Sequence, residues 1–130
     1  EKKDLSYVID LPPAAISATA DEEALQRIFS NLLGNAIKYA DKLVTVRLLP
    51  AERDDSYFVI EISNDGPIIP AEMREKIFQP FFRLKETARK KGTGIGLTLA
   101  RSLTELHRGK LYLKSTREPL NIFILQIPIK

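Results

Sequence analysis

The sequence has no cysteine, a single histidine and no apolar run that approaches the roughly 20 residues of a membrane-spanning helix. Without cysteine the chain can form no disulfide and no thiolate metal site, which fits a reducing compartment. One histidine argues against a histidine-based metal cluster and against a Ser-His-Asp triad. No signal peptide is visible. The 130 residues, 44% hydrophobic and 28% charged, have the composition of one ordinary globular domain.

The positive charge of the chain is confined to one segment. The formal net charge is +3, but residues 83–91 hold five of the 20 basic residues and only one of the 17 acidic residues. The rest of the chain therefore carries one net negative charge. A basic loop of this size suits a small polyanion better than a nucleic-acid backbone, so the sequence disfavours nucleic-acid binding.

The hydrophobic periodicity predicts helices and strands in mixed order. Helices are expected from a capping box at residues 19–22 to about Tyr39, over residues 70–78, and from residues 92–96 to about His107. Strands are expected at residues 5–11, 43–49, 57–63, 110–115 and 121–127. This order predicts an α/β (α+β) two-layer sandwich, with a mixed, mostly antiparallel sheet of about five strands covered on one face by about three helices.

The first predicted helix has a polar face beside its apolar stripe. Asn31, Asn35 and Lys38 are spaced to share that polar face. The apolar stripe that would hold the helix to a core consists of Leu25, Ile28, Phe29, Leu32, Ala36 and Ile37. The two amides could form a solvated helix face. Their oxygens would also suit Mg²⁺, which takes only one or two protein ligands beside phosphate oxygens.

Glycines precede the last predicted helix, in the stretch GTGIG at residues 92–96. Backbone N–H groups at a helix start bind anions, so this stretch is either a phosphate cradle or a flexible helix entry. It is not a dinucleotide-binding fingerprint or a P-loop, because the glycine spacing differs from both. The basic residues upstream are either a solvated charge run or side chains that close over phosphate oxygens.

A third polar motif, NDGP at residues 64–67, follows a predicted strand. It could be a hairpin turn. The segment after it is predicted to be helical rather than a paired strand, however, and a polar side chain at the end of a strand could instead accept a hydrogen bond from the amino group of a base.

Taken in order, these motifs resemble the catalytic ATP-binding domain of sensor histidine kinases, in the wider Bergerat-fold ATPase group. The N box is matched by NLLGNAIKY at residues 31–39 and the first glycine box by NDGPIIP at residues 64–70. The F box is matched by IFQPFFR at residues 77–83 and the second glycine box by GTGIGL at residues 92–97. The resemblance covers essentially the whole chain. The F box is its most kinase-specific part, because gyrase-like relatives lack it.

The resemblance implies ATP and Mg²⁺ as ligands and gives individual positions a role. Asn35 would hold Mg²⁺ with Asn31 beside it, Lys38 and Arg83 would face phosphates, and Tyr39 would flank the nucleotide. The glycines of the second box would form the hinge and phosphate cradle of an ATP lid. The ATP-binding positions that it implies are Asn31, Asn35, Lys38, Tyr39, Asn64, Asp65, Gly66, Ile69, Arg83, Gly92, Thr93, Gly94, Ile95, Gly96 and Leu97.

Asn31 bears on which reaction is expected. Many hydrolytic members of the group carry a glutamate four residues before the magnesium asparagine, as the base for an attacking water. A neutral amide cannot accept that proton. The resemblance therefore favours a kinase, in which an imidazole nitrogen of a partner attacks the γ-phosphorus in line, over a hydrolase of the gyrase type.

The resemblance also implies partners outside this chain. The F-box aromatics Phe78, Phe81 and Phe82 would dock against a helical dimerisation domain, although we expect at least one of them to pack in the core. His107 matches the end of the helix that follows the lid, so the phosphoacceptor histidine is absent. We therefore expect residues 1–130 to be one domain of a longer chain. The resemblance implies that the parent protein is a homodimeric, membrane-anchored bacterial sensor with this domain in the cytoplasm. It implies a response-regulator receiver domain as an indirect partner, and no direct contact of this domain with membrane or nucleic acid.

The chain departs from the family pattern at three places. Asn64 stands in the column of the adenine-binding aspartate, with the acid one residue later at Asp65, and Ile68 replaces the second glycine of that box. Asn64 could still accept from the adenine amine through its amide oxygen, more weakly than a carboxylate. The late glycine box is absent from residues 115–123. These departures keep a second hypothesis open, a degenerate regulatory module that docks partners without phosphotransfer; a hydrolase of the same fold is the third.

Overall fold

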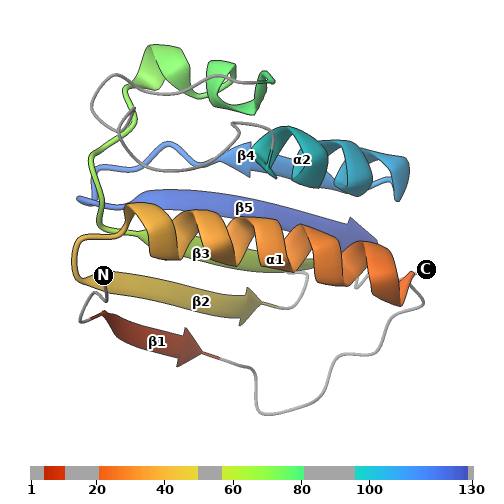
Figure 1. Ribbon diagram of the computed structural model, residues 1–130, viewed down its shortest axis with the longest axis horizontal. Coiled ribbons are helices and arrows are strands. Elements are labelled where there is room, and N and C mark those ends of the chain that lie inside the picture. The colour runs from red at the N-terminus through yellow and green to blue at the C-terminus, as the bar shows by residue number, and fades with distance from the viewer. Residues whose placement is uncertain (1–4, 11–20, 50–56, 81–95, 129–130) are drawn as a thin grey trace.

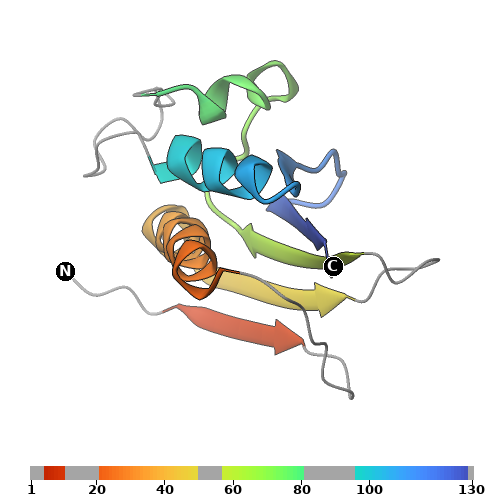
Figure 2. The same cartoon turned by 90° about the vertical axis from the view of Figure 1, so that its right-hand side faces the viewer.

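A computed structural model describes residues 5–10, 21–49, 57–80 and 96–128. The strands are β1 (Ser6–Asp10), β2 (Leu43–Leu49), β3 (Tyr57–Asn64), β4 (Lys110–Leu113) and β5 (Asn121–Pro128), and the α-helices are α1 (Glu22–Tyr39) and α2 (Gly96–Leu106). The strands form one sheet in the order β1-β2-β3-β5-β4. Both helices lie on the same face of the sheet, so the fold is a two-layer sandwich (Figures 1 and 2).

The sheet is mixed, as its connections require. β1 pairs with β2 in parallel, and α1 lies between these two strands in the chain as their crossover. The other three strand pairs are antiparallel. The predicted fold class is therefore confirmed. The short helix predicted over residues 70–78 is instead a pair of 3₁₀ turns, Ala71–Met73 and Lys76–Phe78, because segments of three residues are too short to nucleate an α-helix.

The core lies between the helices and the sheet. Ile28, Leu32 and Ala36 of α1 are buried and pack with Ile60 and Ile62 of β3 in one apolar cluster. Burying such aliphatic side chains stabilises the fold by about 1.5–3 kcal/mol each. The apolar stripe predicted for α1 is thus confirmed at its centre. It is wrong at its edge.

That edge residue is Ile37, whose side chain is 41% exposed. Successive residues of a helix are rotated by about 100°, and the buried line of α1 runs through the residue before it. In α2, the helical spacing of Leu97, Ala100, Leu103 and Leu106 predicts an apolar stripe. This prediction is wrong at Leu106 for a similar reason, since that side chain is 77% exposed. The buried line of α2 runs through Ala100 and Thr104, four residues apart. The Thr104 hydroxyl tolerates burial because it donates to the Ala100 carbonyl at 2.7 Å.

The start of α1 also differs from the prediction. Asp21 is the N-cap, and its Oδ1 accepts the N–H of Ala24 at 3.1 Å. The predicted capping box, with its cap at Thr19, is therefore wrong by two residues. Aspartate caps a helix as well as threonine does, and Glu22 and Glu23 add negative charge to the first turn.

The segments that carry the predicted motifs meet at one end of the sandwich. α1 and α2 run in opposite directions, and the start of α2 lies beside the middle of α1 (Figure 1). β3 runs antiparallel to both of its neighbours. The last residue of β3, Asn64, is therefore paired with Val44 near the start of β2 and with Asn121 at the start of β5.

Candidate functional site

The loop after β3 is pressed against the last residue of α1. A Cβ atom placed on Gly66 would lie 2.1 Å from the carbonyl oxygen of Tyr39 and 3.0 Å from Oδ1 of Asn64. Both atoms belong to residues of the predicted site. Only a glycine allows this approach, so Gly66 fixes the first glycine box against the N box.

Asp65 holds the turn between α1 and β2. Its carboxylate accepts the backbone N–H groups of Asp41 at 2.8 Å, Lys42 at 2.9 Å and Leu43 at 3.0 Å. Partial burial opposes ionisation of this carboxylate, but the backbone hydrogen bonds together outweigh it and lower the pKa of Asp65 below its usual value. Asp65 was predicted as an ATP-binding position, and its oxygens are already directed to these three amides.

We expect Asp65→Asn to destabilise the domain by about 1–2 kcal/mol at pH 7, since hydrogen bonds to a charged acceptor are replaced by weaker ones. A lowered pKa means that this stabilisation is present above the pKa of the unfolded chain, near 4, and is lost as the pH falls through the folded-state pKa. Urea denaturation at pH 7 and at successively lower pH values measures the difference. The gap between the two proteins should close in acid. A gap that stays constant with pH would contradict the role of the charge.

Asn64 and Asn121 form a buried pair of amides, 2% and 5% exposed. Asn64 Oδ1 accepts the N–H of Gly66 at 2.9 Å and the Nδ2 amide of Asn121 at 3.3 Å. Asn121 Nδ2 also donates to the carbonyl of Pro67 at 2.9 Å, and its Oδ1 accepts the N–H of Ile69 at 2.9 Å. Asn121 therefore holds residues 67–69 to the sheet.

Asn121 belongs to the candidate site through these contacts and was not predicted from the sequence. It begins the last strand and lies within the stretch in which the late glycine box is absent, and this was the only signal that could have singled it out. Its role depends on the pairing of β3 with β5, which brings two residues 57 positions apart into contact. Local periodicity carries no information about such a pairing.

The start of α2 meets the polar face of α1 at Asn31. The Nδ2 of Asn31 donates to the carbonyl of Arg27 at 2.9 Å, and a Cβ atom on Gly96 would lie 3.3 Å from Asn31 Oδ1. Asn35 and Lys38 follow one and two turns further along α1, in the direction away from α2. Both are half-buried.

These residues fit a magnesium ion that is bound mainly by phosphate. Among the described residues, no three histidine, cysteine or carboxylate side chains are grouped so as to hold a metal by themselves. Asn31 Nδ2 donates one of its two protons to the Arg27 carbonyl, and its Oδ1, on the side of Gly96, accepts no hydrogen bond from the described residues. Amide oxygens suit Mg²⁺ as one or two ligands among water and phosphate oxygens. The donor set of α1 is therefore compatible with Mg²⁺ when a nucleotide is bound.

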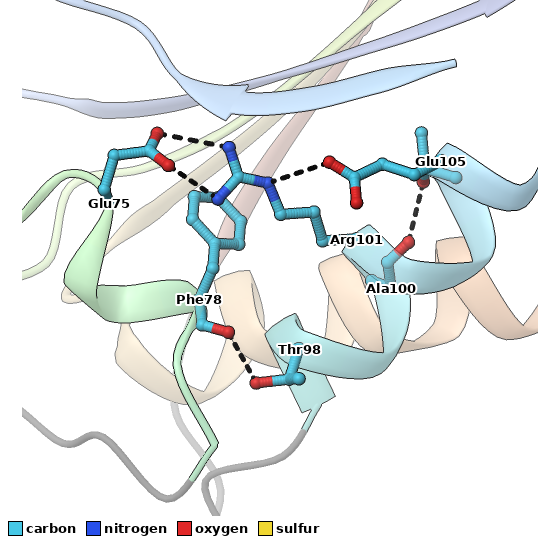
Figure 3. A network of polar contacts seen from close by, with 7 residues as sticks. Glu75, Phe78, Thr98, Ala100, Arg101 and Glu105 are labelled. Atoms are coloured by element: carbon cyan, nitrogen blue, oxygen red, sulfur yellow. Dashed lines mark hydrogen bonds and ion pairs between the residues drawn. The ribbon is translucent and has the colours of Figure 1, made fainter. Parts of the chain in front are cut away.

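The 3₁₀ segment is held on α2 through Arg101, as Figure 3 shows. Its guanidinium donates to both carboxylate oxygens of Glu75, at 2.8 and 3.1 Å, and lies 4.3 Å above the ring centre of Phe78. The hydrogen bonds from Arg101 lower the pKa of Glu75. Thr98 Oγ1 donates to the Phe78 carbonyl at 2.7 Å. Phe78 is 5% exposed and contacts Phe123 edge-on, which confirms that at least one F-box aromatic packs in the core.

The stacking of Arg101 on Phe78 should contribute more to the stability of the contact between the 3₁₀ segment and α2 than the ion pair with Glu75 does. Glu75 is 74% exposed at its side chain, and exposed ion pairs contribute less than about 1 kcal/mol. We expect Arg101→Ala to lower the free energy of unfolding by about 1–2 kcal/mol, because the group stacked on Phe78 is lost. Glu75→Gln, which keeps the stacked guanidinium, should cost less than about 1 kcal/mol. Urea denaturation of the two variants measures both values, and equal losses would contradict this division.

The structure brings together the predicted site residues that it describes. Contacts join α1, the start of α2, the loop after β3 and the start of β5 into one region, which contains Asn31, Asn35, Lys38, Tyr39, Asn64, Asp65, Gly66, Ile69, Gly96 and Leu97. The predicted positions Arg83, Gly92, Thr93, Gly94 and Ile95, and the aromatics Phe81 and Phe82, lie outside the described residues. The roles of all these residues toward a nucleotide stay predictions.

In this two-layer sandwich the polar face of α1, the glycine loop after β3 and the start of α2 meet at one end, and the sequence matches a class of ATPases. The family model described as histidine kinase-, DNA gyrase B-, and HSP90-like ATPase matches residues 20–130. The chain belongs to this family. Its sequence and fold are those of the catalytic domain of sensor histidine kinases, as the following relatives indicate.

The adaptive-response sensory kinase SasA of Rippkaea orientalis is 36% identical over 131 residues, which cover 99% of this chain and 33% of the relative. The SasA of Gloeothece citriformis is 33% identical, with 99% and 33% covered. The catalytic domain of histidine kinase ThkA superposes with a TM-score of 0.80 at 29% identity, covering 97% of this chain and 81% of that one. The mycobacterial sensor histidine kinase MprB gives 0.78 at 26%, with 96% and 82% covered. The chain spans about a third of the length of these curated relatives.

Proposed function

We propose that this domain binds Mg-ATP and transfers the γ-phosphate to a histidine on a separate dimerisation domain. The observation that carries the proposal is the convergence of an amide-bearing helix face, a glycine loop fixed by Gly66 and the start of α2 at one end of the fold. Helix starts and amide oxygens are the groups that receive phosphates and their magnesium ion. Family membership supports the same conclusion.

In this mechanism the chain positions the nucleotide and neutralises the charge of its phosphates, and it does not itself supply the nucleophile that attacks the γ-phosphorus. Asn35, with Asn31 beside it, would hold the magnesium ion, which supplies positive charge to the phosphate oxygens when it is bound. Lys38 would face the phosphates, and Tyr39 would flank the nucleotide. The amide of Asn31 offers no base for a water, so the acceptor must bring its own nucleophile. This favours transfer to an imidazole over hydrolysis.

The partners and location are part of the proposal. We place the phosphoacceptor on a dimerisation segment of the parent chain, with a response-regulator receiver domain downstream and a homodimeric parent. The exposed leucines Leu99 and Leu106 of α2 support a docking role for this helix. Among the described residues, no helix is long and apolar enough to cross a membrane. We propose a cytoplasmic domain of a bacterial sensor that is itself membrane-anchored.

Calorimetric titration with Mg²⁺ and a non-hydrolysable ATP analogue tests the first step. Saturable binding at millimolar nucleotide or below is expected, and its absence would refute ATP binding by this domain. Phosphotransfer is tested by adding γ-labelled ATP and the dimerisation segment of the parent protein. Label on a histidine of that segment is the expected result.

A regulatory module without phosphotransfer is the second candidate. Asn64 Oδ1 already accepts two hydrogen bonds, and Ile68, in place of a glycine, is 54% exposed. Both features would lower the affinity of the site for the adenine base. Binding of the dimerisation segment without transfer of label, under conditions in which the domain is folded, would favour this candidate.

A further inference from the structure

The orientation of the Asn64 amide is fixed by its surroundings. The oxygen and nitrogen of an asparagine side chain are nearly indistinguishable by shape, and their assignment rests on the hydrogen-bond partners. A backbone N–H can only donate, so the N–H of Gly66 at 2.9 Å requires the oxygen of Asn64 on its side. Asn121 is fixed in the same way, because the N–H of Ile69 requires its Oδ1. Its Nδ2 must then face Asn64 Oδ1 and the Pro67 carbonyl.

This arrangement uses both lone pairs of Asn64 Oδ1. One accepts from Gly66 and the other from Asn121, so the oxygen has no capacity left for a further donor. The expectation that this oxygen accepts the adenine amine therefore conflicts with the geometry. Asp65, the neighbouring carboxylate, is instead directed to the N–H groups of residues 41–43, in the turn between α1 and β2.

The group that remains is the Nδ2 of Asn64, with two N–H donors. Within the described part of the chain it makes no hydrogen bond, although Asn64 is only 2% exposed. Arg101 Nε, which is 3.7 Å from Oε2 of Glu105, is the one fully enclosed side-chain nitrogen or oxygen without a hydrogen-bond partner among the described residues. Asn64 Nδ2 is therefore not sealed off, and the small exposed part of this residue leaves it open to solvent or to a ligand.

We propose that Asn64 presents this amide nitrogen to the base, so that the site accepts a purine nucleotide with an oxygen at position 6, such as inosine triphosphate, at least as well as ATP. The proposal rests on the proposed function and on the resemblance that puts Asn64 in the column of the adenine-binding aspartate. A carboxylate at this place would accept from the 6-amino group of adenine and repel a 6-oxo group. An amide nitrogen reverses this preference, because it donates to an oxygen and has nothing to accept from an amine.

The test compares Mg-ATP with Mg-ITP, whose bases differ in the group at position 6 and in the proton that hypoxanthine carries on N1. Calorimetric dissociation constants are measured for the natural chain and for Asn64→Asp. The natural chain should bind ITP as tightly as ATP or more tightly. Asn64→Asp keeps the acceptor toward Gly66 and Asn121, replaces the donor with an acceptor, and should shift the ratio of the two constants by at least tenfold toward ATP, as loss of one hydrogen bond predicts.

A matched variant controls for charge. Gln26→Glu makes the same amide-to-carboxylate change at an exposed position in the first half of α1 and should leave the ratio unchanged. Thermal unfolding checks that both variants fold. ATP binding tenfold tighter than ITP binding in the natural chain would overturn the inference while leaving the proposed function intact. Absence of binding for every nucleotide, in the natural chain and in Asn64→Asp, would instead refute the proposed function and the inference with it.

Discussion

Replacing Gly66 with alanine should destabilise the domain by about 3 kcal/mol, at the upper end of the cost of overpacking. The added Cβ would lie 2.1 Å from the Tyr39 carbonyl oxygen, far inside contact distance. That oxygen belongs to the backbone, and no change of rotamer can move it away. The loop after β3 and the end of α1 must therefore separate. Urea denaturation of Gly66→Ala and of the natural chain measures the loss.

Gly34→Ala is the matched control for this change. Gly34 lies in the middle of α1, and a Cβ atom there would meet nothing within 4 Å. Glycine costs about 1 kcal/mol relative to alanine inside a helix, so this variant should be more stable by about that amount. A Gly66→Ala protein that is as stable as the natural chain would show that the close approach to Tyr39 is not required.

Asn35→Ala should remove the magnesium dependence of nucleotide affinity. If the ion has only one or two protein ligands, loss of one of them removes much of what the protein contributes to holding it. We expect affinity for the ATP analogue in excess Mg²⁺ to fall at least about tenfold, a loss of roughly 1.4 kcal/mol. Affinity in the presence of a chelator should change little. Titrations with and without Mg²⁺, for the natural and variant chains, give the four constants needed.

Gln26→Ala provides the control, since it removes an exposed amide from the same helix far from the site. Its two constants, with Mg²⁺ and with chelator, should equal those of the natural chain. An Asn35→Ala protein that keeps the full difference between magnesium and chelator would refute the assignment of Asn35 as a ligand.

Elements that depend on local pattern were predictable from the sequence. α1 ends at Tyr39 as expected, and β2 and β3 differ from their predicted ranges by at most one residue. Ile28, Leu32 and Ala36 recur at helical spacing, so their burial followed from periodicity alone. The candidate site was predicted from motifs that are each contiguous in the sequence.

What the sequence did not reveal arises from contacts between distant segments. Asp65 accepts hydrogen bonds from backbone N–H groups more than 20 residues away in the chain. Asn121 donates a hydrogen bond to Asn64 across the pair of strands β3 and β5. That Asn64 Oδ1 already accepts two hydrogen bonds becomes evident only when the positions of Gly66 and Asn121 are known. Burial at Thr104 rather than at Leu106 likewise depends on how α2 lies on the sheet. Propensities describe neighbours along the chain and contain no term for such pairs.

The edge strand β1 has a consequence for the order in which the domain opens. It hydrogen-bonds to β2 alone, and all five of its side chains are exposed. The contact of Asp10 with Arg47 is also on the surface. Release of β1 would therefore cost far less free energy than global unfolding, and its amide protons should exchange with solvent long before those of β3 and β5. The domain can lose its first strand while the end that would receive the nucleotide remains folded.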